Sequence, residues 1–163
     1  MKYLSQNLLW TLLRISISFI FLWAFFDKLF GLGFATALDK SWLSGISPTA
    51  GFLKFGTQGL FASFFHSLSG NILIDILFMS GLFLVGLCLL LGIGIRIACY
   101  SGALMMFLIY LSLFPPANNP LIDEHIVYII ILILLAQRSK THDFGLSSKW
   151  RKINIVRKFP ILQ

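Results

Sequence analysis

Long apolar runs dominate the pattern of hydrophobic and polar positions along the chain. The four longest lie at residues 8–30, 72–91, 95–114 and 121–136. Each is close to the ~17–25 residues that a helix needs to cross a bilayer. Because these runs are continuously apolar, they do not fit the alternating strands of a membrane barrel. The pattern therefore predicts four transmembrane helices.

The segment between the first two runs, residues 31–70, has a different pattern. It contains glycine and proline turn signals in "GLG" and "SGISPTAG". In its second half, apolar residues recur at the i, i+3, i+4 and i+7 positions of one helical face, namely Phe61, Phe64, Phe65 and Leu68. This spacing predicts a short helix that lies in the membrane interface, re-enters the bilayer or caps the bundle.

Composition supports an integral membrane protein. Of the 163 residues, 58% are hydrophobic and 12% are charged, about half of the ~25% that is typical of soluble domains. We expect an all-α, four-transmembrane-helix bundle over residues 1–137, followed by a basic cytoplasmic tail over residues 138–163. Cys88 and Cys99 lack the C-x-x-C spacing of a redox pair, so no disulfide is expected.

Basic residues are distributed asymmetrically in a chain whose formal net charge is +7. Seven of them lie in the tail: Arg138, Lys140, Lys149, Arg151, Lys152, Arg157 and Lys158. Loops rich in lysine and arginine stay on the cytoplasmic side, and an even number of spans places both termini there. The charges therefore predict a multi-pass protein of the cell (inner or plasma) membrane. Its expected partners include membrane lipids and no nucleic acid.

The fourth run is short, because its uninterrupted apolar part, residues 126–136, covers only ~16 Å of a ~30 Å hydrocarbon core. Asn119 and Pro120 have the character of an N-cap and a first helical residue. A helix that begins there would be ~25 Å long. The polar triplet "DEH", residues 123–125, would then lie inside the helix.

Helical spacing separates the members of this triplet. Glu124 and His125 would share a side with Tyr128, while Asp123 would point the opposite way from His125. Ionisable residues within a span usually mark a site. The alternative is that the carboxylates stay wet at the interface and only favour the helix dipole.

Two charged features and one set of small residues bear on how the helices pack. Arg14 lies two turns inside the first run, so it either snorkels to the inner headgroups or meets Arg96 around an anionic group. Lys28 is the expected ion-pair partner of Asp75 at the outer side. Small residues also let helix backbones approach closely in lipid, and they are Gly81, Gly86, Ala98 and Gly102.

Four segments together resemble the DoxX/DoxD family of small membrane proteins. They are "FLWAFFDKLFGLGFAT" (21–36), "SPTAGFLKFGT" (47–57), "LLLGIGIRIA" (89–98) and "NNPLIDEHIVY" (118–128). The resemblance implies a four-helix membrane bundle. It also implies the membrane subunit of a thiosulfate:quinone oxidoreductase, which works with a second, DoxA-like subunit and passes electrons from thiosulfate to membrane quinone.

The resemblance directs attention to the chain's polar positions. Those that match the family's pattern are Arg14, Asp27, Lys28, Arg96, Asp123, Glu124 and His125. With quinone as the expected cofactor, the candidate catalytic residues that would relay protons are Asp123, Glu124 and His125. The candidate quinone- or substrate-binding residues are Arg14, Asp27, Lys28, Arg96 and Tyr128. No metal site is expected, and a homo-oligomer stays open.

Two other functions stay open. The chain could be a non-enzymatic membrane scaffold that holds a soluble redox partner through its basic tail. It could instead carry a small anion or a lipid headgroup, since Arg14 and Arg96 have no acidic residue nearby in the sequence. The absence of an evident inverted repeat counts against a carrier.

Overall fold

The computed structural model describes residues 6–117, 119, 121–138 and 145–162. Every regular element in these residues is helical, which confirms the all-α prediction. Three helices are long and apolar enough to cross a membrane: α1 (Gln6–Phe30), α3 (Ile72–Leu91) and α4 (Ile95–Ser112). The fourth apolar helix, α5 (Glu124–Gln137), has 14 residues and is therefore about 21 Å long.

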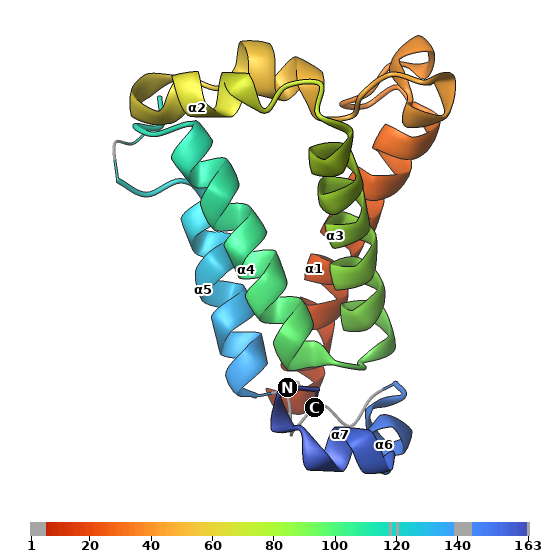
Figure 1. Ribbon diagram of the computed structural model, residues 1–163. Helices are drawn as coiled ribbons and strands as arrows, with labels where there is room; N and C mark the ends of the chain where they lie inside the picture. The colour runs from red at the N-terminus through yellow and green to blue at the C-terminus, as the bar shows by residue number, and fades with distance from the viewer. Residues whose placement is uncertain (1–5, 118, 120, 139–144, 163) are drawn as a thin grey trace, which may run out of the picture.

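The four apolar helices form two pairs (Figure 1). Helix α1 packs against α3, α4 packs against α5, and α3 contacts α4. The pairs lie close where α3 turns into α4 and diverge toward the segment between α1 and α3. We call this segment, residues 31–71, the connection, and its end of the bundle the connection end. The opposite end, where α1 begins and residues 145–162 lie, is the terminal end.

Close packing of the pairs depends on glycine. At Gly86, an added Cβ would lie 2.7 Å from Cγ of Leu22 and 3.0 Å from its backbone nitrogen, so α1 and α3 nearly touch. Ser18 of α1 donates a hydrogen bond of 2.7 Å to the carbonyl oxygen of Gly86. A Cβ at Gly102 would meet the other three helices, at Val85, Leu132 and Phe21. These contacts confirm the expected role of the small residues at Gly86 and Gly102.

The connection crosses the connection end as a series of short helical turns (Figure 1). They are η1 (Leu38–Lys40), η2 (Trp42–Ser44), η3 (Phe52–Gly56), η4 (Gly59–Phe61) and α2 (Ala62–Ser67). Helix α2 confirms the short helix predicted from the phenylalanine spacing. The backbone N–H of Gln58 donates to Ser112 (3.0 Å) and that of Leu60 to Phe114 (3.3 Å), so the connection is attached to the end of α4.

Asp75, in the first turn of α3, holds the other part of the connection. Its Oδ1 accepts hydrogen bonds from Ser47 (2.8 Å) and Thr49 (2.5 Å). The expected Lys28–Asp75 ion pair does not occur in the described part of the chain, because two hydroxyl groups of the connection occupy this carboxylate.

Residues 145–162 fold across the terminal end of the bundle (Figure 1). They form α6 (Ser147–Trp150), α7 (Asn154–Lys158) and η6 (Pro160–Leu162). The backbone N–H of Leu146 donates to Leu91 (2.9 Å), and the Ser147 hydroxyl donates to Gly92 (2.7 Å). The described part of the predicted basic tail is therefore a cap on the end of α3.

Replacing Gly86 with alanine should destabilise the bundle, because the new methyl group has no room between α1 and α3. Overpacking of this kind costs about 1–3 kcal/mol. The measurement is thermal unfolding of the purified protein in detergent. Gly51→Ala is the control, since a Cβ there would meet nothing within 4 Å and the backbone has a helical φ of −61°. Equal melting temperatures for both variants would contradict this account of the packing.

Candidate functional site

The predicted site residues lie in three separate places. Asp27 and Lys28 belong to the last turn of α1, at the connection end. The triplet of residues 123–125 lies at the start of α5, in the other helix pair, and Tyr128 follows one turn later. Arg14 and Arg96 lie in the parts of α1 and α4 nearer the terminal end. The structure thus brings the triplet together but does not join it to Asp27 and Lys28.

Helix α5 begins later than the sequence suggested. It starts at Glu124, and Asp123 is its N-cap: Oδ1 accepts hydrogen bonds from the backbone N–H groups of His125 (3.0 Å) and Ile126 (3.2 Å). The expected start at Asn119 and Pro120 is therefore wrong. An aspartate carboxylate satisfies the free N–H groups of a helix start as well as asparagine does, and here Asp123 takes that place.

Asn119 caps a turn instead of the helix. Its side-chain oxygen accepts from the backbone N–H groups of Leu121 (3.0 Å) and Ile122 (3.2 Å). This is the local asparagine turn that competes with helix formation. Pro120 itself lies outside the described residues.

Asp123 and His125 form a pair, in contrast to the expected opposite directions. Nδ1 of His125 lies 2.8 Å from Oδ2 of Asp123, and their side chains are 15% and 9% exposed. Helical spacing does not apply to Asp123, because its backbone is extended, with φ −122° and ψ −174°. Glu124 is exposed beside them, and the ligand atoms of all three residues lie within 4.8 Å of one another. The triplet could therefore supply three ligands to a metal ion.

The environment of Asp123 changes its acidity. Burial raises the pKa of the carboxyl group, while the hydrogen bonds from the His125 ring and the backbone of Ile126, and the charge of His125, lower it. The hydrogen bonds and the charge together outweigh burial, so the pKa lies below its ordinary value of 3.8. Asp123 is therefore an ionised cap at neutral pH, and it orients the imidazole of His125.

Asp27 occupies a more unusual environment. Its side chain is 1% exposed, and Oδ1 accepts a hydrogen bond of 3.3 Å from the backbone N–H of Phe34. Oδ2 is buried and has no hydrogen-bond partner among the described residues. Phe34 reaches this position because the chain turns back after α1 at Gly31, whose φ is +68° and whose missing Cβ leaves room for the Ala37 carbonyl oxygen.

A pocket of about 350 Å³ lies beside this carboxyl group. Its lining residues come from three successive turns of α1 and from the segment that follows: Phe19, Ile20, Trp23, Ala24, Asp27, Lys28, Phe34 and Ala35. The rings of Trp23 and Phe34 meet edge to face with their centroids 4.9 Å apart, and the Phe19 ring stacks on Trp23 at 5.7 Å. The pocket therefore combines aromatic walls with one carboxyl group and one amine.

Such a pocket suits a flat, mostly apolar ring that carries a few polar atoms. Its volume lies in the ~300–1,000 Å³ range of small-molecule sites, which are apolar with few polar groups. Sequence reasoning had selected Asp27 and Lys28 but missed Phe34, because Phe34 lies beyond the helix. The glycines of "GLG" that let the chain turn back were the available signal.

Arg14 is buried, with 1% of its surface exposed, so of the two alternatives for this residue, snorkelling to the headgroups is wrong. Its Nη2 would lie 3.7 Å from a Cβ placed on Gly145, in the segment that folds over the end of α3. Gly145 has a φ of +96°, and a Cβ there would lie 2.6 Å from the Leu91 carbonyl oxygen. The C-terminal cap therefore encloses this arginine, while Arg96 is half-buried at the start of α4.

Asp123→Ala should remove the cap of α5 and destabilise the protein by about 1 kcal/mol. Because the folded pKa of Asp123 is lowered, its electrostatic contribution is fully present above the unfolded pKa and is lost as pH falls through the folded value, below 3.8. Hydrogen exchange of the His125 and Ile126 amides between neutral pH and about pH 2 measures this loss.

Asp123→Asn is the matched control, since asparagine caps a helix equally well but carries no ionisable proton. It should keep these two amides protected at neutral pH and remove their acid dependence. Unchanged acid dependence in this variant would assign the effect to another group.

Comparisons of the chain with protein-family models, with curated proteins and with solved structures find no match. The resemblance to the DoxX/DoxD family stays a prediction. The feature of the chain that bears most directly on function is therefore the aromatic pocket beside the buried carboxyl group of Asp27.

Proposed function

We propose that this chain is the membrane subunit of a quinone-linked oxidoreductase and that the pocket at the connection end of α1 binds the quinone ring. The observation that carries the proposal is Oδ2 of Asp27, which is buried beside an aromatic pocket and has no hydrogen-bond partner among the described residues. A buried polar atom without a partner is costly, so a ligand that supplies one is favoured there.

The residues of the pocket have distinct tasks. Trp23 and Phe34 offer ring faces and edges against which a flat ring packs. In its protonated form, Asp27 donates a hydrogen bond from Oδ2 to a carbonyl oxygen, and it holds a proton at that atom. Lys28 donates a second hydrogen bond or balances negative charge. When bound, a quinone supplies two-electron chemistry coupled to the uptake of two protons.

Under this proposal, fewer residues bind quinone than the sequence predicted. Asp27 and Lys28 line the pocket, whereas Arg14, Arg96 and Tyr128 do not. The Asp123–His125 pair belongs to the other helix pair, where both side chains are partly exposed and can exchange protons with water. Following the resemblance, the electrons would come from thiosulfate or another sulfur compound, directly or through a second, DoxA-like subunit.

We further propose that α5 is a fourth span, with both ends of the chain in the cytoplasm. Helix α5 runs alongside α4, and about 21 Å of helix is short for a ~30 Å hydrocarbon core. A short span is accommodated by local thinning of the bilayer and by flanking residues. Helix α2 would then lie in the outer interface, where its exposed Phe64 meets lipid.

A scaffold for a soluble redox partner is the second candidate, supported by exposed basic residues on the C-terminal cap. They are Lys149, Lys152, Arg157 and Lys158. Deleting residues 138–163 would be a poor test, because it would also uncover the buried Arg14. Reversing the charge of the four exposed residues leaves the cap in place and tests the scaffold directly.

Asp27→Leu should weaken quinone binding several-fold, because it removes the proposed hydrogen bond, and a hydrogen bond between neutral groups is worth about 0.5–1.5 kcal/mol. The measurement is a titration of the purified protein in detergent with a short-chain quinone, followed by quenching of tryptophan fluorescence. Phe34→Ala should also weaken binding by removing one wall of the pocket.

Asp39→Leu is the control for this titration, since Asp39 is an exposed acid of the connection that does not line the pocket. It should bind quinone like the unchanged chain. If Asp27→Leu and Phe34→Ala both keep full affinity while the chain still binds quinone, the ring binds elsewhere and this assignment of the pocket is wrong.

Single cysteines test the four-span topology. The background carries Cys88→Ala and Cys99→Ala. We expect Asn7→Cys and Ser148→Cys to react with an impermeant maleimide in inverted vesicles or permeabilised cells, and not in intact cells. Ser63→Cys in α2 should react in intact cells. Opposite reactivity of Asn7→Cys and Ser148→Cys would show an odd number of spans.

A further inference from the structure

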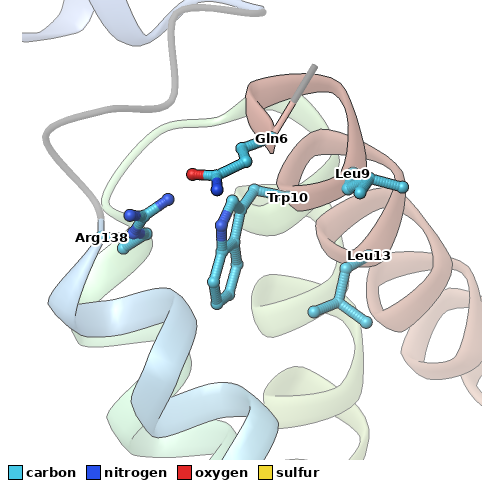
Figure 2. A pocket seen from close by; sticks show the side chains of 5 residues that line it. All are labelled: Gln6, Leu9, Trp10, Leu13 and Arg138. Carbon is cyan, nitrogen blue, oxygen red and sulfur yellow. The ribbon is translucent and has the colours of Figure 1, made fainter. Parts of the chain in front are cut away.

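A second pocket lies at the terminal end of the bundle, far along α1 from the aromatic pocket. It has a volume of about 490 Å³ and is lined by Gln6, Leu9, Trp10, Leu13 and Arg138 (Figure 2). The first four residues occupy the i, i+3, i+4 and i+7 positions of one face of α1. Arg138 follows the last residue of α5, so the pocket joins the start of the first apolar helix to the end of the last.

The lining has a polar part and an apolar part. In Figure 2, the side chains of Gln6 and Arg138 face one another beside the indole of Trp10. The guanidinium carbon of Arg138 lies 5.0 Å from the centre of the Trp10 ring, within the range of a cation–π contact. Leu9, which is 50% exposed, and Leu13 extend from there along α1. A molecule with an anionic head and an apolar chain would match both parts.

The surrounding charge strengthens this match. All the carboxylates of the described residues lie in the connection, in the helix ends next to it or at the start of α5, and they are Asp27, Asp39, Asp75, Asp123 and Glu124. The terminal end has Arg138 and the basic residues of α6 and α7, with no carboxylate from the described part of the chain. The field at this end therefore attracts an anion, and membranes present anionic lipid on the cytoplasmic side.

We propose that this pocket binds an anionic phospholipid, with the headgroup phosphate at Arg138 and Gln6 and an acyl chain along Leu9 and Leu13. A guanidinium group donates two parallel hydrogen bonds to a phosphate, and the amide of Gln6 can add a third. Trp10 suits this depth, because indole rings favour the boundary between headgroups and acyl chains. Bound lipid would bridge α1 and α5, which belong to different helix pairs. The proposal rests on the topology proposed above, with the terminal end in the cytoplasm, and not on quinone binding at the other end.

The test uses the full chain, extracted in a mild detergent from vesicles that contain equal amounts of phosphatidylglycerol and phosphatidylcholine. Native mass spectrometry then counts the lipids that stay bound. We expect the unchanged chain to retain phosphatidylglycerol in preference to phosphatidylcholine. Arg138→Gln should lower this retention about fivefold, since one basic residue at an anionic surface contributes ~1 kcal/mol.

Two variants separate a specific pocket from general attraction by positive charge. Arg157→Gln removes one exposed positive charge from α7, outside the pocket, and should leave retention unchanged. Leu13→Trp keeps every charge but fills the apolar part of the pocket, and should lower retention as Arg138→Gln does. Melting temperatures near that of the unchanged chain show that the variants are folded.

Three results would overturn the proposal. Equal losses in Arg138→Gln and Arg157→Gln would assign retention to general charge, and full retention in Leu13→Trp would show that the pocket is not occupied. Displacement of phosphatidylglycerol by an equimolar amount of soluble glycerol phosphate would show that the site takes the free phosphate ester, with no contribution from an acyl chain.

Discussion

The bundle depends on the close approach of helix backbones at Gly86 and Gly102. Lipid provides no hydrophobic force that drives apolar helices together, so contact must come from tight packing and from interhelical hydrogen bonds. Gly86 supplies both, because it has no Cβ to hold Leu22 away and its carbonyl oxygen accepts from the Ser18 hydroxyl. Gly102 allows residues of all four apolar helices to meet at one point.

The charged groups of the described residues lie toward the two ends of the bundle. At the connection end, the carboxylates are used in different ways: Asp75 holds the connection, Asp123 caps α5 and Asp27 faces a pocket. At the terminal end, Arg14 is enclosed by the C-terminal cap and Arg138 lies over Trp10. Under the proposals made above, this end-to-end separation lets one end exchange protons and the other bind anions.

Both pockets are built on α1, yet they differ in chemistry. The pocket at the connection end is bounded by Trp23 and Phe34 and contains a buried carboxyl group. The pocket at the terminal end has a guanidinium group and an amide above an apolar strip. Under the proposals made here, the first receives a ring that takes up protons and the second receives a lipid that holds the two helix pairs together.

The sequence by itself determined the helical class, the three helices that are long and apolar enough to cross a membrane, and the short helix α2. Continuous apolar runs and 3.6-residue periodicity follow directly from residue order. It also selected Asp27 and Lys28 of the aromatic pocket but not Phe34. It misjudged the start of α5, since Asn119 and Asp123 are equally good caps and only the fold decides between a turn and a helix start.

Tertiary structure alone decided which polar groups meet. The turn at Gly31 places Phe34 beside Asp27. The connection places the hydroxyl groups of Ser47 and Thr49 against Asp75, where an ion pair with Lys28 was expected. These contacts join residues that are 7, 28 and 26 positions apart, and no local pattern encodes them. Likewise, the burial of Arg14 depends on a C-terminal segment that folds back over the bundle. Local composition determines which segments can lie in a membrane, whereas the path of the chain determines which partner each buried polar group contacts.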